Sequence, residues 1–215
     1  MTRRLPSPRA PGAPAGRHRA CLLPPKEGVN PAPVALDPAH ELRRDWELLL
    51  LDLARIRGWE RFLFVQCGDG WIVEEAWRRV LKGFACGLDT SPAHVARATE
   101  LRGIPGKLDF RTWDGTRLPC PSQSFHRVFS TFALERGAQP GALLREMQRA
   151  LLPGGELYVL ELQQEPDERL VAALEAAGFA ESHELVRRVA PDGRGGVILR
   201  ACRAPVEPVA VPPAA

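Results

Sequence analysis

The chain has 215 residues, 45% of them hydrophobic and 26% charged, a composition typical of a globular protein with one sizeable core. No apolar run approaches the ~20 residues that a membrane-spanning helix needs, so the sequence predicts no membrane span. Residues 1–38 hold six basic against two acidic residues, which accounts for the net charge of +3, and the near-neutral remainder disfavours a broad nucleic-acid-binding face.

Residues 1–36 contain eight prolines among alanine, glycine and arginine, a density that forbids regular helix and leaves little apolar surface to bury. We therefore expect a disordered, weakly basic tail at 1–36, a folded domain at 37–204 and a short disordered Pro/Ala tail at 205–215. The five cysteines show neither Cys-x-x-Cys spacing nor histidines at ligand spacing. The sequence thus predicts no metal site and no disulfide framework, and it favours a reducing, cytoplasmic setting.

The folded part is expected to open with a helix and to continue as alternating strands and helices. Asp37-Pro38 is a helix start, and apolar residues then recur at three- and four-residue spacing up to about Arg57. Residues 62–65 form a short apolar run, typical of a buried parallel strand, before the turn 66–70 and a helix at 72–81. The remaining expected elements are strands at 83–89, 108–113, 127–132, 156–162, 184–189 and 196–201 and helices at 92–102, 141–152 and 166–177.

This alternation predicts an α/β fold of the Rossmann-like, doubly wound type, with a mostly parallel sheet and helices on both faces. The last two strands are expected to form a hairpin across the turn 191–196. Right-handed crossovers place the loops after the first three strands along one edge of the sheet. That edge is expected to gather a group of glycine and polar residues: Gly68, Asp69, Gly70, Asp89, Thr90 and Asp114.

The spacing of these residues suits a nucleoside. Glycines in the turn after the first strand let the backbone approach a ligand, and free N–H groups at the next helix start can receive its polar parts. Asp89, about 20 residues beyond, is placed to accept both ribose hydroxyls, although such a residue can also cap a helix. Asp114, after the third strand, can accept an exocyclic adenine amine, although Asp-Gly also forms an ordinary turn.

With these features the chain resembles the class I S-adenosylmethionine-dependent methyltransferases, in particular the small-molecule branch related to the type 11 and ubiquinone/menaquinone methyltransferases. The resemblance covers about residues 61–162 and is expected to extend over the whole body, so that 37–204 is predicted to be a class I methyltransferase domain. It rests on stretches in a fixed order: 67–70 (CGDG), 87–92 (GLDTSP), 110–115 (FRTWDG), 118–125 (LPCPSQSF), 132–135 (FALE), 144–147 (LREM) and 152–155 (LPGG).

The resemblance implies a seven-stranded sheet whose last strand is antiparallel. It also implies S-adenosylmethionine as the cofactor, lying across the strand ends with Asp89 on the ribose and with Asp114 and the Gly115 amide on the adenine. The full set of cofactor-binding residues that it implies is Gln66, Cys67, Gly68, Asp69, Gly70, Asp89, Thr90, Asp114, Gly115 and Thr131.

Three positions depart from the pattern of this family. Phe64 replaces an acidic residue of the first strand, Gln66 replaces a glycine of the turn, and His126 stands where an aspartate is common. In the family that acid helps to hold the amino group of the methionine moiety. Losing one charge-assisted hydrogen bond costs roughly 1.5–3 kcal/mol, or about 10- to 100-fold in affinity. Gln66 brings a side chain to a place where the family keeps the backbone bare.

The sequence identifies no catalytic residue. Methyl transfer needs little from the protein beyond holding the acceptor and the methyl group in line, so the absence of a triad or a metal is expected. Glu135, beyond the fourth strand, is a candidate for a substrate contact. His126 is a candidate base, with a partly exposed histidine of no catalytic role as the alternative. Cys67 is interpreted as structural.

The sequence therefore predicts a methyltransferase that acts on O, N or C of a small-molecule acceptor. The alternative, favoured by Phe64 and Gln66, is a catalytically inactive methyltransferase-like protein that serves as a binding or assembly module. An NAD-dependent dehydrogenase is disfavoured because the turn lacks two of the three glycines of Gly-x-Gly-x-x-Gly. Little chain follows the fifth strand to form a lid, so we expect an open site, or one that a protein partner or a second copy of the chain completes.

Overall fold

The computed structural model describes residues 38–80, 82–134, 140–162, 168–189 and 195–205. The chain divides into two compact units, Met1–Asn30 and Pro31–Ala215, and all described residues belong to the second. The tail predicted at 1–36 and nearly all of the tail predicted at 205–215 lie outside the described residues. The domain boundaries therefore stay predictions.

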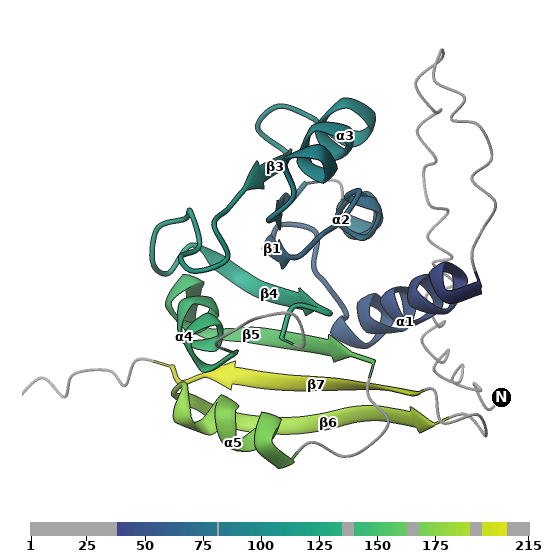
Figure 1. The fold of residues 1–215 in the computed structure, drawn as a ribbon. Helices are drawn as coiled ribbons and strands as arrows, with labels where there is room; N and C mark the ends of the chain where they lie inside the picture. Colours follow the sequence, from purple (N-terminus) through teal and green to yellow (C-terminus); the bar gives the residue numbers. More distant parts are fainter. Residues whose placement is uncertain (1–37, 81, 135–139, 163–167, 190–194, 206–215) are drawn as a thin grey trace, which may run out of the picture. The chain divides into compact units, whose positions relative to one another are not determined.

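One seven-stranded sheet runs through the described residues, in the strand order β3-β2-β1-β4-β5-β7-β6 (Figure 1). All neighbours from β3 to β5 pair in parallel, whereas β7 pairs antiparallel with both β5 and β6. The predicted Rossmann-like fold with an antiparallel last strand is confirmed. The strands are β1 (Arg61–Val65), β2 (Phe84–Asp89), β3 (Leu108–Thr112), β4 (Phe125–Thr131), β5 (Leu151–Glu161), β6 (Phe179–Val189) and β7 (Gly195–Arg203).

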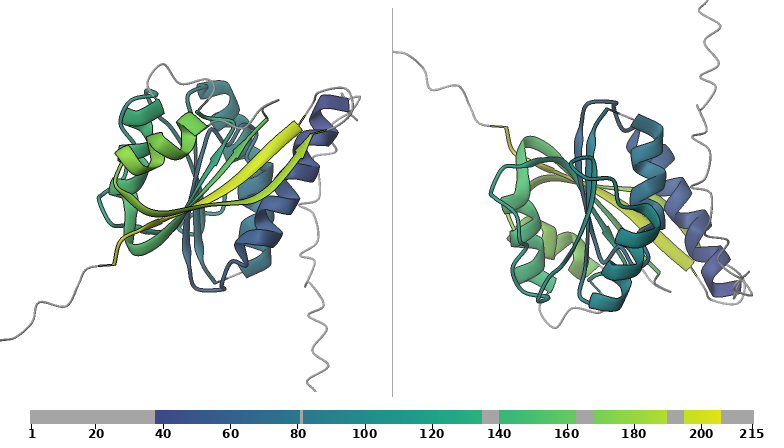
Figure 2. Two further views of the ribbon diagram at one scale, coloured as in Figure 1. Left: turned by 90° about the horizontal axis from the view of Figure 1, so that it is seen from below. Right: turned by 90° about the horizontal axis from the view of Figure 1, so that it is seen from above.

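Helices cover both faces of the sheet, and each face has its own apolar core (Figure 2). On one face α4 and α5 bury Met147 and Leu174 completely. On the other face α1, α2 and α3 bury Leu50, Val73 and Ala98 in the same way. The helices are α1 (Pro38–Ala54), α2 (Trp71–Val80), α3 (Pro92–Arg102), α4 (Pro140–Ala150) and α5 (Glu168–Ala176).

Local sequence explains the elements that flank the expected site. β1 buries residues 62–65 without interruption, as a strand covered on both faces must. α2 buries residues 72, 73, 76, 77 and 80, a stripe at helical spacing that faces the sheet. α3 begins with Ser91 as its N-cap, because the serine side chain accepts the N–H of His94 and Pro92 follows in the first turn.

The boundary between α4 and β5 differs from the prediction. The helix expected at 141–152 ends at Ala150, because Leu151 already pairs with Phe125 as the first residue of β5. The proline-glycine-glycine turn at 153–155 lies inside β5 as an irregularity of its pairing with β4. The parallel ladder resumes where Glu156 pairs with Arg127.

A buried ion cluster fixes the end of α1 to the sheet. Arg127, at the start of β4, is 8% exposed, and its guanidinium lies 3.0 Å from Glu60 Oε2 and 2.8 Å from Glu156 Oε2. The same guanidinium donates a hydrogen bond to the carbonyl oxygen of Ala54, the last residue of α1. The helix ends there, three residues earlier than predicted, because Arg55 adopts a left-handed φ of 46°.

The parallel register brings the carboxyl ends of four strands to one edge of the sheet. Val65 of β1 aligns with Leu88 of β2 and with Ser130 of β4, and Asp89 aligns with Thr112 of β3. The turns that follow these strands therefore meet at the same edge, as the sequence predicts.

Candidate functional site

The turn after β1 leaves its backbone open at one glycine. Gln66, Gly68 and Gly70 all adopt positive φ angles, of 63°, 58° and 77°. A Cβ atom on Gly70 would lie 2.5 Å from the Phe110 ring, so packing requires this glycine. A Cβ atom on Gly68 would meet nothing within 4 Å. Gly68 is thus the point of the turn where a ligand can approach the bare backbone.

Asp89 is the last residue of β2 and is hydrogen-bonded to the turn after β1. Its Oδ2 accepts the N–H of Gly68 at 2.8 Å, and its Oδ1 accepts the N–H of Ser91 at 2.9 Å. His94 Nδ1 lies 3.1 Å from Oδ1. Asp89 is only 5% exposed, yet a carboxylate has about four acceptor positions, so Oδ2 can receive a further donor. The structure thus brings the acid of the second strand and the glycine turn together.

Gln66 directs its side chain toward the end of β2. Its Oε1 accepts the N–H of Thr90 at 3.2 Å, and its Nε2 lies 3.4 Å from Thr90 Oγ1. The hydroxyl of Thr131, at the end of β4, donates to the Gln66 carbonyl at 3.4 Å. Gln66, at the end of β1, is therefore hydrogen-bonded to the ends of β2 and β4, and its side-chain amide contacts Thr90.

The turn after β3 holds Asp114 and Gly115 beside the end of β2. Asp114 Oδ1 accepts the N–H and the hydroxyl of Thr116, both at 2.8 Å, and the N–H of Arg117 at 3.0 Å. These bonds, that from Arg117 first, lower the pKa of Asp114 to about 2. Its Oδ2 accepts no hydrogen bond from the described residues and can receive a ligand. A Cβ atom on Gly115 would lie 3.7 Å from the Thr90 methyl carbon.

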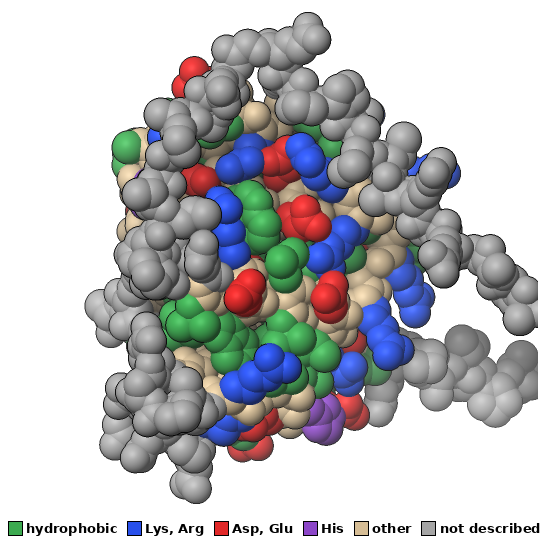
Figure 3. Space-filling model, turned by 90° about the vertical axis from the view of Figure 1, so that its right-hand side faces the viewer, with side chains coloured by type: hydrophobic (Ala, Val, Ile, Leu, Met, Phe, Trp, Pro, Cys, Tyr) green, Lys and Arg blue, Asp and Glu red, His purple; other side chains and the backbone are tan. Residues whose placement is uncertain are grey.

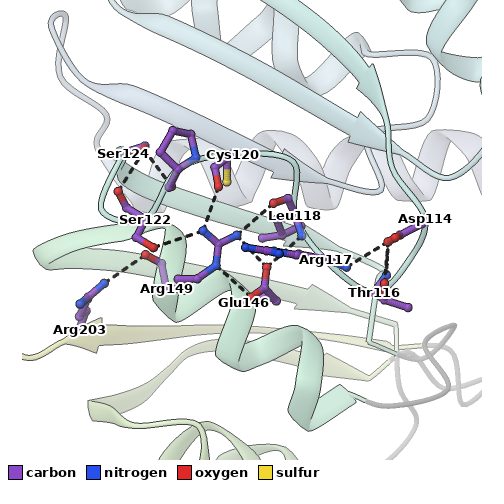
Figure 4. A network of polar contacts seen from close by, with 11 residues as sticks. Asp114, Thr116, Arg117, Leu118, Cys120, Ser122, Ser124, Glu146, Arg149 and Arg203 are labelled. Carbon is purple, nitrogen blue, oxygen red and sulfur yellow. Dashed lines mark hydrogen bonds and ion pairs between the residues drawn. The ribbon is translucent and has the colours of Figure 1, made fainter.

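One ion pair on α4 holds the loop that continues from Asp114 (Figure 4). Arg149 donates to the carbonyl oxygens of Leu118 at 3.0 Å and of Cys120 at 2.9 Å, and it pairs with Glu146 at 2.7 Å. Glu146 in turn accepts the N–H of Leu118 at 3.0 Å. The loop is therefore anchored to a helix that packs on the sheet, which fixes the turn that carries Asp114.

Two of the predicted site residues have roles inside the protein. Asp69 Oδ1 accepts the N–H of Trp71 at the start of α2, and its Oδ2 lies 3.2 Å from Arg102 of α3. Cys67 is buried, and burial raises the pKa of its thiol far above the ordinary range, with the nearby Asp89 charge adding to the effect. A thiol in this state is not a nucleophile at neutral pH, which agrees with a structural role.

The position in β1 where the family usually has an acid is filled by an aromatic stack. Phe64 is 0% exposed, and its ring centroid lies 4.5 Å from that of Phe129 with the planes 11° apart. Phe129 stacks in turn on Tyr158 at 5.4 Å. Phe64 thus belongs to the core of the sheet, and β1 supplies no charged side chain to the site.

Helix α1 brings charged side chains to the same edge. The Arg43 guanidinium lies 4.1 Å from the centroid of the Phe132 ring, just beyond β4. The Arg44 guanidinium lies 4.9 Å from the Trp71 ring, at the start of α2. Sequence reasoning missed this contribution, because an Arg-Arg pair on an amphipathic helix has the same pattern whether it faces solvent or a site.

Glu47 stands one turn further along α1. Burial raises the pKa of its carboxyl group to about 7, and the charge of Asp69 in the glycine turn adds to this, while Arg43 and Arg44 oppose it. Glu47 lies three positions after Arg44, whose guanidinium contacts the Trp71 ring at the end of the turn after β1. The acid nearest to this edge on α1 thus comes from a helix rather than from the first strand.

Of the two catalytic candidates from the sequence, His126 is among the described residues. Glu135 lies outside the described residues. His126 lies at the opposite edge of the sheet, where its Nδ1 accepts the N–H of Arg61 at 3.0 Å and its ring meets Trp59 edge-on at 4.9 Å. It lies five positions before Thr131 along β4, roughly 16 Å at the rise of a strand. His126 is therefore not placed to serve as a base at the edge of the sheet where the glycine turn, Asp89 and Asp114 lie.

Surface charge is mixed on the face shown in Figure 3, where basic and acidic side chains lie between apolar areas. Over the described ranges, no helix is long and apolar enough to cross a membrane. The same residues contain no group of three or more His, Cys, Asp or Glu that could hold a metal ion.

Comparison with known proteins identifies the part of the chain that forms this site. Residues 63–159 match a family model described as a methyltransferase domain, of the type 11 class. This part of the chain is similar to the methyltransferase domains of that family. The domain runs from β1 into β5, and it contains the glycine turn, Asp89 and Asp114. The resemblance drawn from the sequence is thereby confirmed.

Individual relatives agree with the family match. The chain is 29% identical over 143 residues to the ubiquinone/menaquinone biosynthesis C-methyltransferase UbiE of Pseudomonas putida, and the match covers 65% of this chain and 56% of that protein. The chain thus spans little more than half the length of this relative.

Solved structures agree on the fold. The [4+2]-cyclase SpnF matches with a TM-score of 0.64 at 22% identity, over 76% of this chain and 82% of that one. A SAM-dependent methyltransferase from Aquifex aeolicus matches with a TM-score of 0.61 at 19% identity, over 77% and 94%. At these identities the two structures establish the fold alone.

Proposed function

We propose that the protein binds S-adenosylmethionine and transfers its methyl group to a small-molecule acceptor. The observation that carries the proposal is the buried Asp89 carboxylate, hydrogen-bonded to the open backbone of Gly68 at the end of β2. The described residues fit the adenosine part of this cofactor. Asp89 would hold the ribose hydroxyls, and Asp114 Oδ2 with the Gly115 N–H would hold the adenine.

When bound, S-adenosylmethionine supplies a sulfonium-activated methyl group, and the protein has to align an acceptor with it. Proximity and orientation account for a large part of such rate enhancements, so no dedicated base is required of the chain. Phe132 follows β4 at this edge with a φ of 57°, a strained value for a bulky residue. Such strain concentrates at functional sites, which supports an acceptor position beyond the end of β4.

The acceptor to test first is an electron-rich ring of the quinol type, because the Pseudomonas relative is named as a C-methyltransferase of ubiquinone and menaquinone biosynthesis. We place the reaction in a reducing, cytoplasmic setting. A protein partner or a second copy of the chain that completes the acceptor side is part of the same proposal.

A binding module without catalysis is the second candidate. It is favoured by Phe64, since β1 offers the cofactor no charged side chain. SpnF is named as a cyclase and has the same fold, so the fold alone does not establish methyl transfer.

Calorimetric titration with S-adenosylmethionine and S-adenosylhomocysteine tests the proposal. We expect micromolar binding by the wild type and binding weaker by about 100-fold or more in Asp89→Asn, because charge-assisted hydrogen bonds to the ribose are lost. Asp109→Asn is the matched control, since this strand carboxylate pairs with the exposed Arg111 instead of facing the site. Absence of binding by a cooperatively folded wild type would refute the proposal and favour the binding module.

A further inference from the structure

Helix α1 has two charged side chains at the cofactor edge that lack hydrogen-bond partners. Arg44 Nε is buried and has none among the described residues. Glu47 makes no hydrogen bond or ion pair with any described residue. Both residues are half-buried, and a polar atom withdrawn from water without a hydrogen-bond partner is costly, so a ligand that bonds to these groups would be stabilising.

The two side chains have opposite charge and lie three positions apart, which places them on one face of α1. That face meets the glycine turn. Arg44 lies over the ring of Trp71, which follows Gly70 directly. The charge of Asp69 contributes to the raised pKa of Glu47. This face of α1 thus presents a cation beside the turn where Gly68 leaves room for a ligand, with an anion one turn further along the helix.

A ligand that enters along this turn, with its nucleoside on Asp89 and Asp114, has its other end nearer to β1. In S-adenosylmethionine that end is an amino acid, a zwitterion with one ammonium and one carboxylate group. Phe64 is stacked in the core, and Gln66 is engaged with Thr90, so neither offers it a charge. Only a side chain from another element can do so.

We propose that Arg44 and Glu47 of α1 bind the amino-acid end of the cofactor. The Glu47 carboxylate would bind the ammonium group of the ligand, and the Arg44 guanidinium would bind the carboxylate of the ligand. The assignment rests on the proposed function and names the part of that site which β1 does not supply. It makes α1 a binding element rather than only a packing element. It also explains why Phe64 is compatible with cofactor binding.

The pH dependence of binding follows from the same arrangement. Glu47 is faced by Arg43 and Arg44 of its own helix and by Asp69 of the glycine turn, and its pKa lies near 7 in the free protein. Only the ionised carboxylate attracts an ammonium group. Affinity for a ligand with the amino-acid end should therefore rise between pH 6 and pH 8, whereas affinity for a ligand without it should stay flat.

The test compares two ligands by calorimetry at pH 8. S-adenosylhomocysteine carries the amino-acid end, and 5′-methylthioadenosine lacks it. In Glu47→Gln we expect S-adenosylhomocysteine to bind about 10- to 100-fold more weakly than in the wild type, with 5′-methylthioadenosine unchanged. Arg44→Gln should show the same selective loss. Asp45→Asn, an exposed carboxylate on the same helix, is the matched control and should bind both ligands as the wild type does.

The outcomes separate this inference from the proposed function. Binding of both ligands by the wild type, with S-adenosylhomocysteine affinity in Glu47→Gln equal to that in Asp45→Asn, would overturn the inference and leave the cofactor site on Asp89 intact. Equal losses for both ligands would also overturn it, since a general disturbance of the site would then be the cause. Failure of the folded wild type to bind either ligand would refute the proposed function and this inference together.

Discussion

At the residue scale, the two glycines of the turn after β1 serve different purposes. Gly70→Ala should destabilise the protein by about 2–5 kcal/mol, because it adds overpacking against Phe110 to the cost of a left-handed alanine. Gly68→Ala should cost only about 1–2 kcal/mol, because its Cβ would point into open space. Urea unfolding of the two variants measures the difference.

The effect on ligand binding should not follow the effect on stability for these two glycines. Gly68→Ala should weaken S-adenosylhomocysteine binding despite its milder effect on stability, since the new methyl group occupies the side from which a ligand approaches. A Gly68→Ala protein with wild-type affinity would show that the ligand does not pass over this backbone.

The residue scale also shows where sequence reasoning works. The contact between Asp89 and Gly68 was predictable, because both belong to one strand-helix-strand unit whose geometry fixes their separation. The role of Glu47 was not, because it depends on how α1 packs across the sheet, a long-range arrangement that helical periodicity does not encode. The use of the Asp69 side chain to cap α2 was likewise invisible in the pattern of the turn.

At the scale of elements, the position of α1 depends on the cluster around Arg127. Arg127→Met should destabilise the protein by about 3–5 kcal/mol, because the buried carboxylate of Glu60 would lose its cationic partner, while the half-buried Glu156 would keep Arg200. The exposed pair of Arg111 and Asp109 provides the control, since Arg111→Met should change stability by less than about 1 kcal/mol. Chemical denaturation of both variants measures the two values.

Equal and small effects of these two arginine substitutions would contradict the structural role of the cluster. A large effect confined to Arg127→Met would support a further consequence. Arg127 also donates a hydrogen bond to the carbonyl oxygen of Ala54 at the end of α1. The Arg127→Met substitution should therefore increase the rate of amide hydrogen exchange more in α1 than in α4.

The elements show a second limit of sequence reasoning. The apolar pattern that predicts a helix at 141–152 continues through Leu151 and Leu152, so nothing local marks the end of the helix at Ala150. The boundary is set by pairing of Leu151 with Phe125, a contact across the sheet. Element order and type followed from periodicity and turn residues, whereas this boundary depended on the partner strand.

At the scale of the whole molecule, Glu47 links overall stability to pH. Its folded-state pKa lies near 7, above the value of 4.5 for a free carboxyl, so the folded protein holds the proton more tightly than the unfolded chain. The resulting stabilisation is complete below about pH 4.5 and is lost as the pH rises through 7. Between pH 5 and pH 8 the wild type should therefore lose on the order of 2 kcal/mol more than Glu47→Gln.

Comparing the two proteins removes the contribution of all other titrating groups, provided that these stay the same in both. Urea unfolding at pH 5 and pH 8 gives the four free energies, and equal changes in both proteins would show that Glu47 is not a buried acid. A bound cofactor should act in the opposite direction, because its ammonium group stabilises the ionised carboxylate. S-adenosylhomocysteine should then raise the melting temperature of the wild type more at pH 8 than at pH 6, and that of Glu47→Gln equally at both.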